Sequence, residues 1–266
     1  MMNLAATWVI VALVVVVTTA QDVGSFIYRA DGLYMTYEVN EDHEVQVRCL
    51  VYGRPDRPPR APVDYLFGLY PLSRVGGFSY IIEFKEGLPS VDDWYEFIGT
   101  NLIAAGWIEP DDSHQPAGIL PGDLTKLTYK SGDSFSTSFR NKEVLFSRVT
   151  RSLIPGKFVY NEPVHSHLYI GYRIHVNETV EIQIGCDSRS TPLVRFKLSA
   201  RNSGLLYFHY AAKSAGTGTL DQFLQHVRSV CPSQYLSSDD LSRVVVATER
   251  TIFIPFGAQR KALTKV

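Results

Sequence analysis

An internal repeat constrains the fold of this chain more than any other feature of its sequence. Residues 33–47 (LYMTYEVNEDHEVQV) and 168–182 (LYIGYRIHVNETVEI) align without a gap over fifteen positions, of which four are identical. Apolar and polar residues alternate in both segments, which is typical of strands with one buried face. Polar residues at 40–43 and 175–178 interrupt the alternation and predict a hairpin turn in each segment. The pattern therefore predicts two copies of one β-rich unit.

Each predicted copy also contains one helix after its strands. Ser90 and Asp93, and again Thr219 and Gln222, fit the capping box. In this arrangement a hydroxyl and an acceptor side chain three residues later satisfy free amides at a helix N-terminus. Apolar residues follow both caps at helical spacing, and a proline lies beyond each predicted end. The two helices occupy matching places in the two copies.

The remaining segments complete the predicted unit. Candidate third and fourth strands precede each helix, and two further alternating segments follow it. Because the strands follow one another through short links, the fold class that we expect is α+β. Two tandem divergent repeats are expected, each an antiparallel four-stranded meander with one helix packed on it, then two further strands. The predicted organisation is a signal peptide at 1–20, repeat unit 1 at 21–142, a linker at 143–163, repeat unit 2 at 164–258 and a basic C-terminal tail at 259–266.

The first twenty residues indicate secretion. Residues 9–17 are an unbroken apolar run, and Thr18 and Ala20 are the small residues that a signal peptidase accepts. No Lys or Arg precedes Arg29, so the usual basic region is missing, and an uncleaved membrane anchor is the alternative. The apolar stretch is only marginally long enough to cross a bilayer, which takes about 20 residues. We expect cleavage after Ala20, an extracellular mature chain and no stable membrane insertion afterwards.

Three cysteines are too few for a disulfide-dense scaffold, and their spacing matches no zinc motif. Cys231 closes the apolar face of the second predicted helix, and Cys186 ends the second strand of the same copy. A helix packed across that sheet would bring the two within bonding reach. We therefore expect a Cys186–Cys231 disulfide and a buried free thiol at Cys49, because Leu102 occupies the matching helix position of the first copy. Three reduced, packed cysteines are the alternative.

Two predicted loops are candidates for surface function. Asn177 begins an Asn-Glu-Thr sequon in a predicted turn, so we expect it to be glycosylated. Prolines at positions 55, 58 and 59 favour an extended, pre-ordered path for the loop around them. Arg54, Arg57 and Arg60 on this loop could bind carboxylates, phosphates or sulfated sugar. The alternative is a solvated loop that proline keeps rigid.

None of the residue patterns identifies an enzyme or a metal site. No GxSxG nucleophile elbow occurs, and the glycines at 216–218 lack the spacing of a phosphate-binding loop. His165 and His167 share one strand face, but a metal would need further ligands from elsewhere. Asp92 and Asp93 suit the first turn of a helix, where the dipole favours negative charge. We expect no catalytic residue, no metal ligand and no cofactor.

Three classes of function remain for a chain of this kind. The chain has 26 Lys and Arg against 27 Asp and Glu, so it implies no general attraction to nucleic acid or to anionic membranes. The leading hypothesis is a secreted, non-catalytic binding protein that presents loops to an extracellular protein or glycan partner. An alternative is a carrier of an apolar small molecule or lipid in a pocket between sheet and helix, since aromatic residues commonly line such pockets. A secreted hydrolase is the second alternative.

Overall fold

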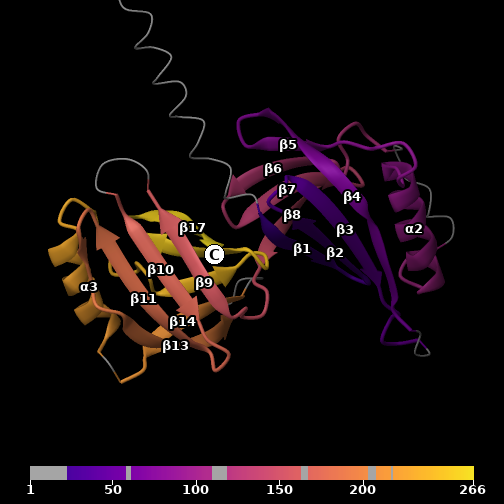
Figure 1. Ribbon diagram of the computed structural model, residues 1–266. Helices are drawn as coiled ribbons and strands as arrows, with labels where there is room; N and C mark the ends of the chain where they lie inside the picture. Colours follow the sequence, from indigo (N-terminus) through magenta and orange to yellow (C-terminus); the bar gives the residue numbers. More distant parts are fainter. Residues whose placement is uncertain (1–22, 58–60, 110–118, 163–166, 203–207, 217) are drawn as a thin grey trace, which may run out of the picture.

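The alternating segments of the sequence pair into two closed barrels (Figure 1). The computed structural model describes residues 23–57, 61–109, 119–162, 167–202, 208–216 and 218–266. The first barrel consists of β1 (Gly24–Ala30), β2 (Leu33–Val39), β3 (Glu44–Val51), β4 (Val63–Gly76), β5 (Ser79–Ile82), β6 (Lys126–Ser131), β7 (Ser134–Phe139) and β8 (Lys142–Val149). These strands pair antiparallel in the order of the chain, and β8 pairs back onto β1.

The second barrel closes in the same way. It consists of β9 (Gly156–Asn161), β10 (Tyr169–Ile174), β11 (Thr179–Cys186), β13 (Val194–Asn202), β14 (Phe208–Ser214), β15 (Arg243–Val246), β16 (Thr251–Phe256) and β17 (Gln259–Lys265). Here β17 pairs back onto β9, and the short β12 (Arg189–Ser190) is added at the end of β11. In both barrels a helix follows the fifth long strand, α2 (Val91–Ala104) in the first and α3 (Leu220–Val230) in the second.

The α+β prediction is wrong, because the structure is mostly β and each sheet closes on itself. Strands hold 52% of the described residues and helices 11%, and that part of the chain contains two helices. The strands that the prediction omitted are β1 and β8 in one half and β9 and β17 in the other. These are the four strands whose pairing closes the barrels. An open four-stranded meander would leave unpaired backbone groups along two edges, and closure removes both edges.

The structure places strands in two segments that the prediction kept outside the repeat units. The proposed linker at 143–163 contains most of β8 and all of β9, and the proposed basic tail at 259–266 contains β17. The predicted signal peptide at 1–20 lies outside the described residues. In the described part of the chain, neither helix is long and apolar enough to span a membrane.

The two barrels repeat each other in backbone detail. His43 and Glu178 are matched in the sequence repeat, and both adopt left-handed backbone angles, with φ of 56° and 62°. Leu124 and Leu241 are matched in the segments after the helices, and their φ angles are 55° and 61°. Non-glycine residues seldom adopt this conformation. Its recurrence at paired positions indicates that both halves are copies of one unit.

The helices lie at the two outer ends of the molecule (Figure 1). Ser90 and Thr219 are their N-caps, and both capping boxes form as the sequence predicts. Trp94 of α2 is fully buried, and its ring centroid lies 5.4 Å from that of Phe67 and 5.4 Å from that of Tyr70. Each helix therefore packs its apolar side against a barrel, as the sequence predicts.

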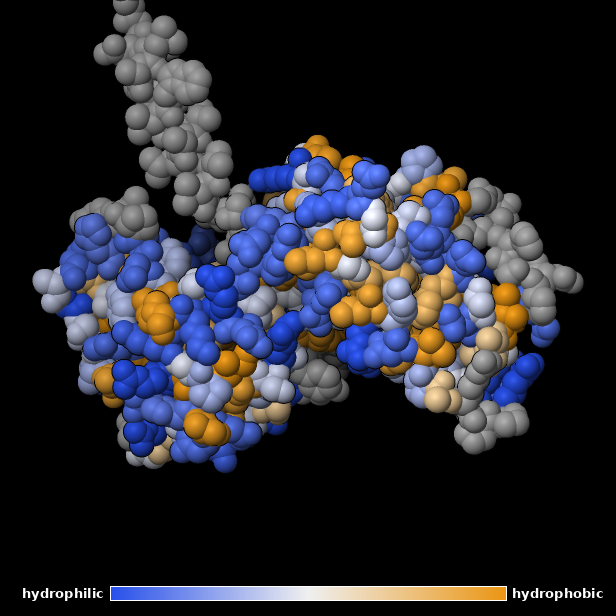
Figure 2. All heavy atoms as spheres, turned by 45° about the vertical axis from the view of Figure 1, so that its right-hand side comes forward, coloured by the Kyte–Doolittle hydropathy of each residue, from blue (hydrophilic) through white to orange (hydrophobic). Residues whose placement is uncertain are grey.

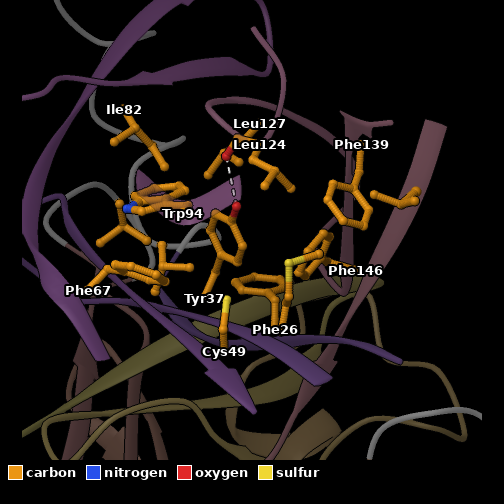
Figure 3. Packing of buried hydrophobic residues seen from close by; sticks show 14 of the residues in the cluster. Phe26, Tyr37, Cys49, Phe67, Ile82, Trp94, Leu124, Leu127, Phe139 and Phe146 are labelled. Atoms are coloured by element: carbon orange, nitrogen blue, oxygen red, sulfur yellow. Dashed lines mark hydrogen bonds between the residues drawn. The ribbon is translucent and has the colours of Figure 1, made fainter. Parts of the chain in front are cut away.

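Aromatic side chains fill the interior of the first barrel (Figure 3). The rings of Phe135 and Phe146 stack with centroids 4.8 Å apart, and Tyr37 meets Phe146 edge-on at 4.8 Å. The hydroxyl of Tyr37 donates a 2.7 Å hydrogen bond to the carbonyl of Leu124. An eight-stranded barrel is just wide enough for side chains to fill it.

A buried arginine joins the two barrels. The side chain of Arg148 is fully buried, and its guanidinium lies 4.3 Å from the ring centroid of Phe26 and 4.9 Å from that of Phe253. Phe26 belongs to the first barrel and Phe253 to the second. The Nε of Arg148 donates a 2.9 Å hydrogen bond to the carbonyl of Gly132, and Asp133 lies 3.5 Å away. These partners offset the cost of burying the charge.

Further contacts stabilise this interface between the barrels, which we call the joint. Arg260 of β17 forms an ion pair with Asp133 of the β6–β7 turn. Glu41 of the first barrel accepts a 2.8 Å hydrogen bond from the hydroxyl of Thr251 in the second. A small apolar cluster lies beside them, made of Val245, Ala247 and Phe253. The barrels are thus connected by charge pairs, hydrogen bonds and apolar packing together.

Candidate functional site

The cysteines occupy the predicted places. Cys186 at the end of β11 and Cys231 at the C-cap of α3 form a disulfide, with their α-carbons 5.3 Å apart. Cys49 is free and buried, and burial raises the pKa of its thiol to about 12. The thiol is therefore neutral at physiological pH and is not an activated nucleophile. Val51 and Leu102 occupy the corresponding positions of the first barrel, where both are buried.

The described residues contain no group of three His, Cys, Asp or Glu side chains that could hold a metal ion. His167 lies in the segment before β10, and its predicted partner His165 falls outside the described residues. Asp93 accepts hydrogen bonds from the backbone and hydroxyl of Ser90, which is its capping role. His167 and Asp93 therefore do not belong to a common metal-binding or catalytic cluster.

The two loops predicted for modification and binding lie on the surface. Asn177 is exposed in the β10–β11 hairpin, where its side-chain oxygen accepts a 2.7 Å hydrogen bond from the hydroxyl of Thr179. Its glycosylation stays a prediction. Arg54 forms an ion pair of 2.6 Å with Asp56 and donates to the carbonyl of Gly106 after α2.

The arginine loop is partly committed to the turn that follows α2. The guanidinium of Arg54 lies 5.8 Å from the ring centroid of Trp107, and the side chain of Arg57 packs against Gly106. Arg60 lies outside the described residues. A binding role for this loop stays a prediction, and the internal contacts of Arg54 reduce the charge that it can offer a partner.

A groove of about 290 Å³ lies beside the joint between the barrels. Its charged lining is already paired: Asp133 with Arg260, and Asp239 with Arg243. Asp240 is buried and accepts hydrogen bonds of 3.0 and 3.1 Å from the backbone amides of Ser237 and Gly257. The groove therefore offers a ligand few free polar groups, although Phe253 and Pro255 supply some apolar surface.

An apolar surface follows the outside of β4 and β5 in the first barrel. Its members are at least one-third exposed, and they are Leu66, Leu69, Val75, Phe78 and Ile81. Figure 2 shows hydrophobic residues gathered on the visible side of this barrel, whereas the visible side of the second barrel is mainly hydrophilic. Exposed apolar surface of this kind is more typical of contact regions than of ordinary solvated surface.

The second barrel carries a cluster of cationic side chains on the outward faces of β10, β13 and β14. We call it the basic face, and it consists of Arg173, Arg195, Lys197, Arg201 and Lys213. All five are exposed. Because outward residues alternate along a strand, residues two apart on β13 lie about 7 Å from each other on one face.

The strand register places these charges side by side. Arg173 and Arg195 flank Glu181 of β11 on its two sides, and Lys197 lies directly opposite Lys213. Glu181 is the one acidic residue at the described outward positions of β10, β11, β13 and β14. Its hydrogen bond from Arg195, at 2.7 Å, holds the pKa of the Glu181 carboxyl below its usual value. The other four cations form no ion pair within the part of the chain that the structure describes.

The chain-wide charge balance conceals this face. Residues 1–150 contain 12 Lys and Arg against 19 Asp and Glu, whereas residues 151–266 contain 14 against 8. The net charges of the two halves are therefore −7 and +6. Counting charges separately for each repeat would have revealed the asymmetry, but only the strand register shows which residues share a face.

Comparisons with known proteins do not identify a family. No protein-family model matches the chain, and no curated protein is similar enough to match it. The disulfide is consistent with an extracellular location, because disulfides persist in oxidising compartments.

Proposed function

We propose that this protein is a secreted, non-catalytic binding protein that recognises an extracellular protein or glycan with the outer surface of its paired barrels. The observation that carries this proposal is the filled interior. Large side chains occupy the centre of each barrel, and α2 and α3 pack additional aromatic residues, Trp94 and Phe223, against them. A barrel packed in this way has no room for a ligand inside, so a partner would bind to its outer surface.

The filled interior weighs against the carrier alternative. In the second barrel, Phe158, Tyr172, Phe196 and Phe223 are buried to within 1% of full coverage. An apolar ligand would have to displace several of these rings, and their packing contributes to the stability of the barrel. The carrier alternative therefore requires a large rearrangement, whereas surface binding requires none.

The hydrolase alternative has less support from geometry. It needs titratable groups with contrasting environments in one cleft. In the groove beside the joint, each of the carboxylates Asp133, Asp239 and Asp240 already has an arginine or backbone amide partner. The outer surface provides two better candidates for a binding site, the apolar surface on β4 and β5 and the basic face of the second barrel.

The full chain should be expressed in secretory cells, and the labelled product measured for binding to cell surfaces and matrix. We expect N-terminal processing, and saturable binding that protease or glycosidase treatment of the target abolishes. A fluorescent fatty acid and a panel of ester, peptide and glycoside substrates test the alternatives in parallel. Stoichiometric uptake of the fatty acid without surface binding, or turnover of a substrate, would contradict the proposal.

A further inference from the structure

We infer that the basic face of the second barrel binds a linear sulfated polysaccharide. This inference rests on the proposed function and narrows its partner to one chemical class. Five cations share the surface with one carboxylate, and that carboxylate is already paired with Arg195. The face is therefore complementary to a polymer that carries closely spaced anionic groups.

The opposed lysines provide a second argument. Lys197 and Lys213 occupy directly opposite positions on β13 and β14, and no acidic side chain forms an ion pair with either in the described residues. Like charges at directly opposite positions destabilise a sheet. An anionic group bound between the two ammonium groups would remove this repulsion. The pair is thus unfavourable in the free protein and favourable in a complex with a polyanion.

The distribution of charge over the whole molecule favours one binding orientation. The first half of the chain has a net charge of −7, and the second half has a net charge of +6. A polyanion would be repelled from the first barrel and attracted to the second. Because the barrels are connected through Arg148 and its partners, the acidic barrel stays close enough to exert this effect.

A sulfated polysaccharide fits the face better than nucleic acid or a membrane does. At the described outward positions of β10, β13 and β14, Tyr169 of β10 is the one Phe, Tyr or Trp, and successive bases would need several such rings on which to stack. The described outward positions of β13 and β14 contain Ala211 but no large apolar residue that could enter a bilayer. The disulfide is consistent with an extracellular location, where sulfated polysaccharides are available to the protein.

The test measures binding of the secreted full chain to immobilised heparin over a range of NaCl concentrations. We expect saturable binding that weakens as salt rises, and weaker binding to heparin from which the sulfates have been removed. Lys197→Ser/Lys213→Ser should lower the affinity about tenfold or more. It should also reduce the slope of log affinity against log salt by about 2, by analogy with phosphate contacts in nucleic-acid complexes.

Matched controls separate this site from general charge effects. Lys126→Ser/Lys142→Ser changes the net charge equally but removes exposed lysines of the first barrel, and it should leave heparin affinity unchanged or slightly altered. The Lys197→Ser/Lys213→Ser variant should unfold at no lower a urea concentration than the native protein, because the substitutions remove the repulsion between the two lysines. Asn177→Gln is tested as well, because Thr179 of the same sequon pairs with Lys197, and a glycan there would lie beside the face.

The outcomes distinguish this inference from the proposed function. Absence of heparin binding, or equal losses in both lysine pairs, overturns the inference. Equal or tighter binding to duplex DNA or to phosphatidylserine vesicles overturns the assignment to a sulfated polysaccharide. If labelled protein still binds cell surfaces while heparin binding is absent, the proposed function stands and this inference fails. If sulfate-dependent binding is lost only with Lys197 and Lys213, the inference is supported.

Discussion

Removal of the Cys186–Cys231 disulfide should destabilise the second barrel by about 4 kcal/mol. The bond encloses a segment with a sequence separation of 45 residues. In the chain-entropy model, opening a loop of this length returns about 13 cal/mol/K to the unfolded chain, or about 4 kcal/mol at 25 °C. The bond also ties the end of α3 to β11, so its loss frees the helix that covers this barrel.

The variant for this test is Cys186→Ala/Cys231→Ala, and Cys49→Ala is its matched control. Cys49 is equally buried but forms no bond, so its replacement removes only packing and should cost about 1 kcal/mol. With a urea m-value of about 2 kcal/mol/M, the double variant should shift the unfolding midpoint of the second barrel by about 2 M.

Two optical signals distinguish the barrels in this experiment. Outside the predicted signal peptide, the chain has tryptophan only at Trp94 and Trp107, and both lie outside the second barrel. Tryptophan fluorescence therefore reports on the first barrel, whereas far-UV circular dichroism reports on both. We expect the dichroism transition to move further than the fluorescence transition. The reasoning would be refuted if the double variant unfolded at the same urea concentration as Cys49→Ala within error. Three reactive thiols in the unfolded, unmutated protein would also refute it.

Three further predictions concern the joint and the free thiol. Gly24→Ala should cost about 1–3 kcal/mol in urea unfolding, because φ is 130° and the new methyl group would collide with Arg148; an unchanged midpoint would contradict this. Burial raises the pKa of Glu41, but hydrogen bonds from threonine hydroxyls, including Thr251, outweigh it, so the folded pKa lies below 4.5. Its contribution to stability should be present above pH 4.5 and disappear as pH falls through the folded value, and Thr251→Val should reduce this dependence in urea midpoints measured from pH 7 to 3. Iodoacetamide at pH 8 should leave Cys49 unmodified in the native protein and label it once in urea, and rapid native labelling would show that the thiol is accessible.

Local features of this protein could be predicted from its sequence because they depend on residues close together in the chain. The capping boxes at Ser90 and Thr219 each join residues three positions apart. The hairpins of the repeat follow from alternating side chains and a short polar interruption. The disulfide was a longer-range prediction, and it succeeded because the repeat placed Cys186 and Cys231 on elements that pack together.

Closure of the barrels depended on tertiary structure. Ser25 pairs with Val149, and Val159 pairs with Thr264, so each closing contact joins strands more than 100 residues apart. No local pattern marks such a pairing, because a strand at a sheet edge and a strand inside a barrel can have the same alternation. The free energy that selects closure comes from pairing the backbone groups of both edges at once.

The candidate binding surface also depended on tertiary structure. The residues of the basic face are separated by up to 40 positions, from Arg173 to Lys213, and the chain as a whole is nearly neutral. Strand register brings them onto one side, and the same register turns Phe196 and Leu198 inward between them. The sequence by itself determined which residues alternate and where the helices begin, and it predicted the Cys186–Cys231 pair that the structure confirms. Only the closed sheet decided that the charges of the second half would gather on one surface, because side-chain direction in a barrel is set by the pairing of distant strands.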